Sequence, residues 1–251
     1  GGMVQERPEN AVISLTTYRA DLLRILGENS AVIIHELKGP LAGIRAHLQL
    51  MERQICLNGN GESLFGDRFA LLYGEISRMG QLINEYLSLA SQREPQLKKV
   101  DPVQLIIQTT MLLRSLCLSN GVMLETDLPE VQRMMLLDEQ QIKQVLINLI
   151  LNAQQACGCG GHIAVRLKYS TRDMILSVED DGIGIGGETL NRIFEPLFTT
   201  KDNGNGLGLA IVRQIIQRHQ GQIEVFSELN RGSCFKVHIP CLFELNKQQP
   251  E

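Results

Sequence analysis

His35 and Glu36 are adjacent in a helical pattern and could together form an activated nucleophile. A neutral imidazole attacks through one ring nitrogen, while a carboxylate holds the other N–H group, fixes the tautomer and stabilises the developing charge. Gly39 and Pro40 follow, and both weaken a helix, because proline removes a backbone donor and glycine loosens the turn. Isolated histidines are more often structural or surface residues, so both interpretations stay open at this point.

Asn148 and Asn152 lie four residues apart, on one face of a helix that is otherwise rich in Leu and Ile. Buried amides need partners, since the burial of an unsatisfied polar group is costly. An amide oxygen is a hard neutral ligand that suits Mg²⁺, and magnesium usually arrives with phosphates. The alternative is that both amides cap neighbouring loops.

Asp180 ends an expected strand and is followed by Gly182 and Gly184. A carboxylate can accept a hydrogen bond from the exocyclic amino group of adenine, and glycines let the backbone approach a flat ring closely. An ordinary acidic turn is the competing interpretation, because Asp-Gly is a common turn signal.

A third stretch has three glycines at alternate positions, Gly204, Gly206 and Gly208, between Lys201 and an apolar helix. Such a loop delivers backbone N–H groups and a helix N-terminus, which together can hold phosphates. The spacing matches neither the dinucleotide-binding fingerprint nor a Walker A loop.

The histidine lies in the first of two expected long helices, each with one apolar seam at alternating steps of three and four. A glycine-rich break at residues 58–61 separates the helices. A lone hairpin cannot cover both seams, so we expect two copies to pair into a four-helix bundle. The alternative is a hairpin packed on its own C-terminal domain. The seam residues are Ile34, Leu37, Leu41, Ile44, Leu48 and Met51, then Phe69, Leu72, Ile76, Met79, Ile83 and Tyr86.

The rest of the chain predicts a second domain. Residues 94–102 contain two prolines and a charge cluster, which is typical of a linker, and we expect a hinge there. The whole is an α+β multidomain chain: a helical hairpin in residues 1–93, an α/β sandwich with a mixed sheet in residues 103–245, and a polar tail in 246–251. Helices are expected at 103–118, 138–157 and 206–219, and strands at 121–128, 134–137, 162–169, 174–178, 222–227 and 234–239.

The composition excludes some functions. The chain has 251 residues, a formal net charge of −4 and no basic stripe, which gives no support to nucleic-acid binding. The six cysteines lack metal-binding spacing, and we expect reduced thiols in a cytoplasmic protein. No apolar run is long enough to cross a bilayer.

The order and spacing of these motifs resemble the H, N, G1, F and G2 boxes of bacterial sensor histidine kinases, with residues 194–198 as the F box. The resemblance implies a dimerising hairpin that carries the phosphoacceptor and a Bergerat-type (GHKL) ATP-binding domain. It implies ATP-dependent autophosphorylation and phosphoryl transfer to an aspartate of a response-regulator receiver domain in two-component signal transduction. Residues 35–45 and the short lid, which is the glycine-rich stretch of residues 199–208, look most like the nitrogen-regulatory sensor kinases.

Carried over by position, the resemblance makes His35 the phosphoacceptor and Glu36 its general base. Asn152 corresponds to the Mg²⁺ ligand, with Asn148 assisting at the phosphates, and Asp180 corresponds to the acid that reads adenine. Two phenylalanines should flank the lid, and a lysine and glycines should cover the phosphates. The other implied ATP-binding residues are Gly182, Gly184, Phe194, Phe198, Lys201, Gly204, Gly206, Leu207 and Gly208.

Two positions depart from the family pattern. Gly39 stands where relatives usually have Asn or Thr, a side chain implicated in orienting water for dephosphorylation of the partner, so weak phosphatase activity is expected. Gln155 stands where many relatives have a lysine or an acid. The resemblance also implies a homodimer. Because Gly1 and Gly2 look like a cloning remnant, we expect a fragment whose sensor region, the only route to a membrane, is absent.

Two other functions stay open. A dimeric scaffold could bind ATP without transferring its phosphoryl group, and another GHKL-type ATPase could act on ATP without labelling a histidine. The paired helices ahead of the ATPase domain favour the kinase.

Overall fold

The computed structural model describes residues 94–131, 133–201 and 204–241, together with residues 41, 43, 44, 46–51, 71–74, 76, 79, 80, 82, 83, 85 and 89. The chain divides into two units, Gly1–Asn84 and Glu85–Glu251. His35, Glu36 and Gly39 lie outside the described residues, as does the predicted polar tail.

The predicted hairpin helices are helical at every described position between residues 41 and 51 and between residues 71 and 89. Among the predicted seam residues, Met51 and Leu72 are buried. Four others remain between 43% and 54% exposed in the single chain: Leu41, Leu48, Ile76 and Ile83. The described part of one hairpin therefore leaves much of its predicted seam uncovered.

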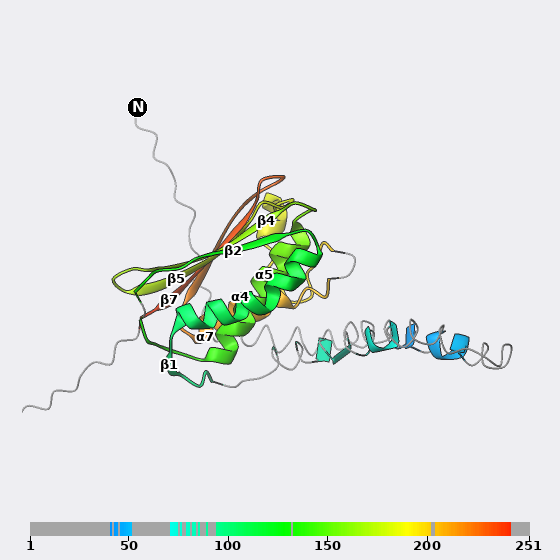
Figure 1. Ribbon diagram of the computed structural model, residues 1–251, viewed down its shortest axis with the longest axis horizontal. Coiled ribbons are helices and arrows are strands. Elements are labelled where there is room, and N and C mark those ends of the chain that lie inside the picture. The colour runs from blue at the N-terminus through cyan, green and yellow to red at the C-terminus, as the bar shows by residue number, and fades with distance from the viewer. Residues whose placement is uncertain are drawn as a thin grey trace, which may run out of the picture. The chain divides into compact units, whose positions relative to one another are not determined.

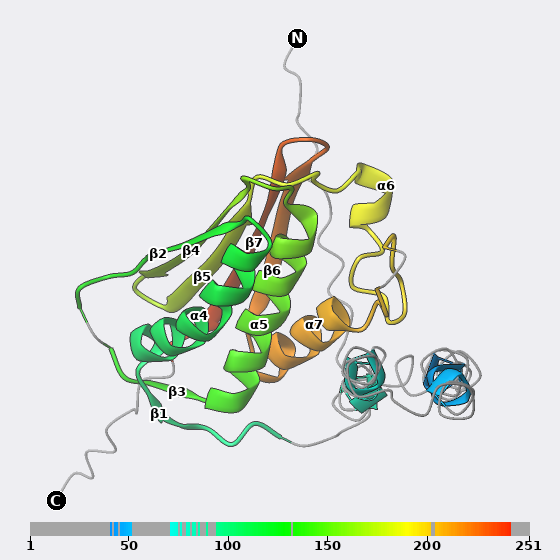
Figure 2. The same ribbon diagram turned by 45° about the vertical axis from the view of Figure 1, so that its right-hand side comes forward.

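The second unit is built on a five-stranded sheet in the order β2-β4-β5-β7-β6. Strands β2 and β4 are parallel and the other neighbours are antiparallel, so the predicted mixed sheet is confirmed. Helices α4, α5 and α7 cover one face of the sheet (Figure 1), and Figure 2 shows all three from the helix side. The strands are β2 (Met123–Asp127), β4 (His162–Tyr169), β5 (Asp173–Asp180), β6 (Gln222–Glu228) and β7 (Gly232–Pro240); the helices are α4 (Pro102–Ser119), α5 (Glu139–Ala156), α6 (Gly187–Leu190) and α7 (Gly208–Arg218).

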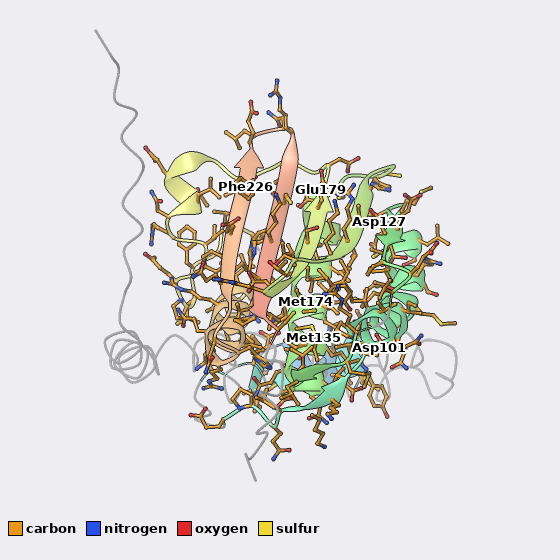
Figure 3. All side chains as sticks on the ribbon, turned by 90° about the vertical axis from the view of Figure 1, so that its left-hand side faces the viewer. Asp101, Asp127, Met135, Met174, Glu179 and Phe226 are labelled. Carbon is orange, nitrogen blue, oxygen red and sulfur yellow. The ribbon has the colours of Figure 1, made fainter. Side chains whose placement is uncertain are left out.

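Strand β5 shows how the sheet separates its two faces. Met174, Leu176 and Val178 are each 1% exposed and form part of the core. Because side chains alternate along a strand, Met174 and the exposed Glu179 lie on opposite faces (Figure 3). Asp180 comes two residues after Val178 and therefore takes an inward-facing position, where it is only 5% exposed.

A short strand that the sequence did not predict precedes the first helix of the sheet domain. Strand β1 (Lys98–Val100) lies within the segment expected to be a linker, and it pairs antiparallel with β3 (Met135–Leu137). Helix α4 follows at once. Asp101 caps it by accepting a hydrogen bond from the Val103 N–H group at 2.9 Å, and proline occupies the first turn.

Asp138 joins three segments at the start of α5. Its carboxylate accepts hydrogen bonds from the backbone N–H groups of Gln141, at 3.1 Å, and Gln96, at 2.9 Å. Its own N–H group donates to His219 Nε2 at 3.1 Å. His219 Nδ1 therefore carries the hydrogen and donates to the Ile215 carbonyl at 2.9 Å. Burial lowers the pKa of His219, so the ring is held neutral.

The five cysteines that the structure describes are free thiols. Burial, together with the carboxylates of Asp180 and Asp181, raises the pKa of Cys157 to about 11. That thiol is therefore protonated and unreactive at neutral pH. Across the described ranges, no helix is both long enough and apolar enough to span a membrane.

The neutral state of His219 predicts a loss of stability in acid. An unfolded histidine titrates near pH 6.5, and the pKa of folded His219 is lower. Below about pH 6.5 the unfolded state binds a proton that the folded state excludes, so the free energy of unfolding should fall by up to about 1.4 kcal/mol per pH unit. His219→Gln should flatten this dependence in urea unfolding at pH 7.5, 6.5 and 5.5. Parallel pH curves for the two proteins would contradict the assignment.

Candidate nucleotide-binding site

The predicted motifs of the second unit converge on the C-terminal half of α5. The Asn148 Nδ2 group donates to the Gly208 carbonyl at 3.0 Å, which joins α5 to the start of α7. The Ile183 N–H group donates to the Ala156 carbonyl at 3.1 Å, which joins α5 to the loop after β5. Segments far apart in the sequence are thus fastened to one helix.

Asp180 is a buried acid with backbone donors around it. Its Oδ1 atom accepts a hydrogen bond from the Gly182 N–H group at 2.9 Å. Burial raises the pKa of Asp180, while the N–H groups of Gly182 and Ser233 and the positive charge of Lys201 act in the opposite direction. The site therefore holds a strong acceptor in a place where water is scarce, which suits recognition of a ligand amino group.

Gly182 and Gly184 are required by the packing of the chain itself. A Cβ atom at Gly182 would lie 2.5 Å from the Ala156 carbonyl oxygen. Gly184 has φ +66°, and a Cβ atom there would lie 2.0 Å from the Glu228 carbonyl oxygen. These contacts within the chain are enough to explain why both residues are glycine. The expectation that the two glycines also leave room for the adenine ring therefore stays a prediction.

Asn148 is 8% exposed and has both ends of its amide satisfied. Its Oδ1 atom accepts from Gln144 Nε2 at 2.9 Å, and its Nδ2 group reaches Gly208 as described above. This geometry favours the interpretation in which the amide ties down a neighbouring loop. Asn148 sets the position of α7 on α5.

Asn152 has a different environment, because its oxygen faces a cation. Lys201 Nζ lies 3.4 Å from Asn152 Oδ1 and 2.8 Å from Gln155 Oε1. Burial lowers the pKa of Lys201, and the charge of Asp180 opposes this shift. Gln155 is a residue of this site that the sequence motifs did not predict, although its position three residues after Asn152 places both on one helix face.

The same oxygen is suited to a magnesium ion. Asn152 Oδ1 already accepts hydrogen bonds from an ammonium group, and an amide oxygen is a ligand that Mg²⁺ takes. The described residues contain no group of three or more His, Cys, Asp or Glu side chains that could hold a metal.

The backbone of Lys201 makes two hydrogen bonds to other residues of the lid. The Lys201 N–H group donates to Thr199 Oγ1 at 3.1 Å, and the Gly204 N–H group donates to the Lys201 carbonyl at 3.1 Å. A Cβ atom at Gly204 would lie 2.4 Å from Thr199 Oγ1. These contacts hold the backbone of Lys201 while its side chain extends toward α5.

The glycine-rich loop leads into an uncapped helix. Asp101 and Asp138 cap α4 and α5, whereas α7 follows the buried Leu207 without a side-chain hydrogen bond at its cap. The first N–H groups of α7 are thus available to an anion such as phosphate. Gly206 precedes them with φ +66°, and a Cβ atom there would lie 2.6 Å from the Phe198 nitrogen.

The two predicted phenylalanines each contact an arginine. Arg192 Cζ lies 4.2 Å from the ring centre of Phe198, and Arg213 Cζ lies 5.9 Å from that of Phe194. Leu197, which lies between the two phenylalanines in the sequence, has φ 65° and donates its N–H group to the Gly206 carbonyl at 3.0 Å. The backbone of this segment is therefore tied to the end of the lid. Neither arginine was predicted.

Both halves of the chain match known protein families. Residues 26–95, which include His35, match the His Kinase A (phospho-acceptor) domain. Residues 137–242 match the family of histidine kinase-, DNA gyrase B- and HSP90-like ATPases.

Similar proteins with both regions are known. Sporulation kinase A of Bacillus subtilis is 33% identical over 238 residues, which cover 94% of this chain and 38% of that protein. The sensor histidine kinase ZraS of Escherichia coli is 34% identical over 226 residues, which cover 88% of this chain and 47% of that protein. The chain thus spans less than half the length of each of these relatives.

Two solved structures of the histidine kinase ThkA are similar to this chain. The catalytic domain of the histidine kinase ThkA is 32% identical with a TM-score of 0.54, and the match covers 58% of this chain and 96% of that domain. ThkA in complex with the response regulator protein TrrA gives a TM-score of 0.73 at 28% identity, over 92% of this chain and 68% of that chain. The chain therefore belongs to the sensor histidine kinase family, with a phosphoacceptor domain followed by a GHKL-type ATP-binding domain.

Proposed function

We propose that this chain transfers the γ-phosphoryl group of ATP to His35 and then to an aspartate of a response-regulator receiver domain. One observation carries the proposal: a phosphoacceptor region that includes His35 is joined to a domain in which Asp180, Asn152 and Lys201 gather at one end of α5. Asp180 can hydrogen-bond to a nucleotide base, Asn152 can bind a metal, and Lys201 can approach phosphates.

Each role follows from the chemistry of the side chain. Asp180 would accept a hydrogen bond from the adenine amino group. Asn152 would supply an oxygen to Mg²⁺, which offsets negative charge on the phosphates when it is bound with ATP. The uncapped N-terminus of α7 would donate N–H groups to the phosphates. His35 would attack the γ-phosphorus through one ring nitrogen while Glu36 holds the other N–H group.

We also propose a homodimer that works in the cytoplasm. The half-exposed seam residues Leu41, Leu48, Ile76 and Ile83 support dimerisation, because a second hairpin would remove their apolar surface from water. The match of residues 26–95 to a phosphoacceptor domain and the likeness to ThkA, whose structure includes a response regulator, support the receiver-domain partner. ATP supply and reduced thiols favour the cytoplasm.

The finer assignment to nitrogen-regulatory sensor kinases rests on residues 35–45 and the short lid. The relatives found by comparison carry other names: sporulation kinases, AtoS and ZraS. The nitrogen-regulatory likeness therefore stays a proposal about these residues alone.

The reaction predicts an acid-labile, alkali-stable label. The 251-residue protein incubated with [γ-³²P]ATP and Mg²⁺ should become radioactive, and His35→Gln should abolish the label. His47→Gln, the same change further along the predicted helix, should keep it. Transfer to a panel of receiver domains should follow. An acid-stable label, or steady ATP turnover without a label, would favour another GHKL-type ATPase.

Asp180→Asn should weaken ATP binding by about ten- to a hundredfold, the loss expected for a hydrogen bond to a charged group. The amide oxygen would still accept from Gly182, but the amide nitrogen would then face the adenine amino group, donor against donor. Calorimetric titration with ATP measures the effect, and the melting temperature without nucleotide should stay near wild type. Asp181→Asn, the same change at an exposed neighbour, is the matched control. Equal ATP affinity in the two variants would mean that the adenine ring binds elsewhere.

Gly39 predicts weak phosphatase activity, because glycine has no side chain to orient a water molecule. With ADP and Mg²⁺, the wild-type protein should release phosphate slowly from a phosphorylated receiver, and Gly39→Asn should release it faster. Rapid release by the wild type would rule the idea out.

A further inference from the structure

Lys201 is held by two amide oxygens that belong to α5. Nζ lies 2.8 Å from Gln155 Oε1 and 3.4 Å from Asn152 Oδ1, across 46 and 49 residues of sequence. The two acceptors are three residues apart on one helix face, so a single ammonium group can reach both. The shorter contact is with Gln155, a residue to which neither the sequence motifs nor the proposed reaction gives a role.

We infer that Gln155 is a positioning residue that latches the lid to α5 through Lys201 and keeps the ammonium group beside the phosphate end of the nucleotide. The inference rests on the proposed function for its nucleotide, but the latch itself rests on contacts within the chain. Gln155 acts through Lys201 and has no role in the chemical step.

Lys201 and a bound magnesium ion would compete for one oxygen. Asn152 Oδ1 accepts from the lysine, and the proposed reaction gives the same atom to a magnesium ion. Two cations close to one neutral oxygen repel each other. Binding of the metal and nucleotide would therefore weaken the contact between Lys201 and Asn152. Gln155 Oε1 would then keep Lys201 anchored on α5.

The neutral charge of Gln155 matters to this exchange. An amide oxygen accepts from an ammonium group but adds no negative charge near bound phosphates. A carboxylate at residue 155 would hold Lys201 more tightly through an ion pair, and it would repel phosphate groups. A thioether of the same length would accept only weakly and would leave Lys201 with the longer contact to Asn152 as its one amide partner on α5. A carboxylate and a thioether at residue 155 should therefore have opposite effects on the contact with Lys201, whatever their effect on nucleotide binding.

Limited trypsin digestion tests the latch directly, since trypsin must take the Lys201 side chain to cut after it. The rate of this cleavage, followed by mass spectrometry without nucleotide, is measured relative to cleavage after Arg172 in the exposed β4–β5 turn. Gln155→Met should speed cleavage by about two- to tenfold, the factor that corresponds to one lost hydrogen bond. Gln155→Glu should slow it below the wild-type rate. Gln154→Met, the same change one residue earlier, should leave it unchanged.

Titration with the non-hydrolysable ATP analogue AMPPNP and Mg²⁺ completes the test. Both Gln155→Met and Gln155→Glu should bind it more weakly than wild type, although their cleavage rates move in opposite directions. A residue that only stabilised the helix would not give this opposite pair. Equal cleavage of Gln155→Met and Gln154→Met would overturn the latch. Failure of the wild type to bind the analogue would instead overturn the proposed function, while the cleavage rates would still decide the latch.

Discussion

Helix α5 must bury one face under the sheet and still present polar side chains along another, and the layout of the site depends on this constraint. The polar strip consists of Asn148, Asn152 and Gln155, at successive steps of four and three residues. Three segments contact this helix at different points. The start of α7 bonds to Asn148, the lid bonds to Gln155, and the loop after β5 bonds to the end of the helix. The buried face includes Val145, Leu146, Leu149 and Ile150, which have no exposed surface.

The polar groups of the site satisfy one another. Asn148 has two internal partners, Asp180 has backbone donors, and Lys201 has two amide oxygens. Ligand binding is then an exchange of partners, and its free energy is a difference between two sets of hydrogen bonds. Small changes in a neutral acceptor can therefore alter affinity without altering the fold.

The sequence predicted the elements with strong periodicity and missed contacts between distant residues. The strands and helices expected in residues 103–240 are all present, because alternation and helix caps are local signals. Strand β1 was missed, since three residues between a charged run and a proline show no period. The motif residues from Asn148 to Gly208 lie along α5, the neighbouring loops and α7. The Lys201–Gln155 contact and the separate environments of Asn148 and Asn152 depend on tertiary packing, which spacing does not reveal.

Strand β1 and Asp138 also determine how the ATP-binding domain could be excised for separate study. A fragment that starts at Val103, where the sequence places the domain boundary, would lose the strand that pairs with β3 and the N–H group of Gln96 that bonds to Asp138. It would expose the edge of β3, and unpaired strand edges promote aggregation. A fragment that begins before Gln96 would keep both contacts. The residues that resemble a linker in the sequence are thus also part of the folded second domain.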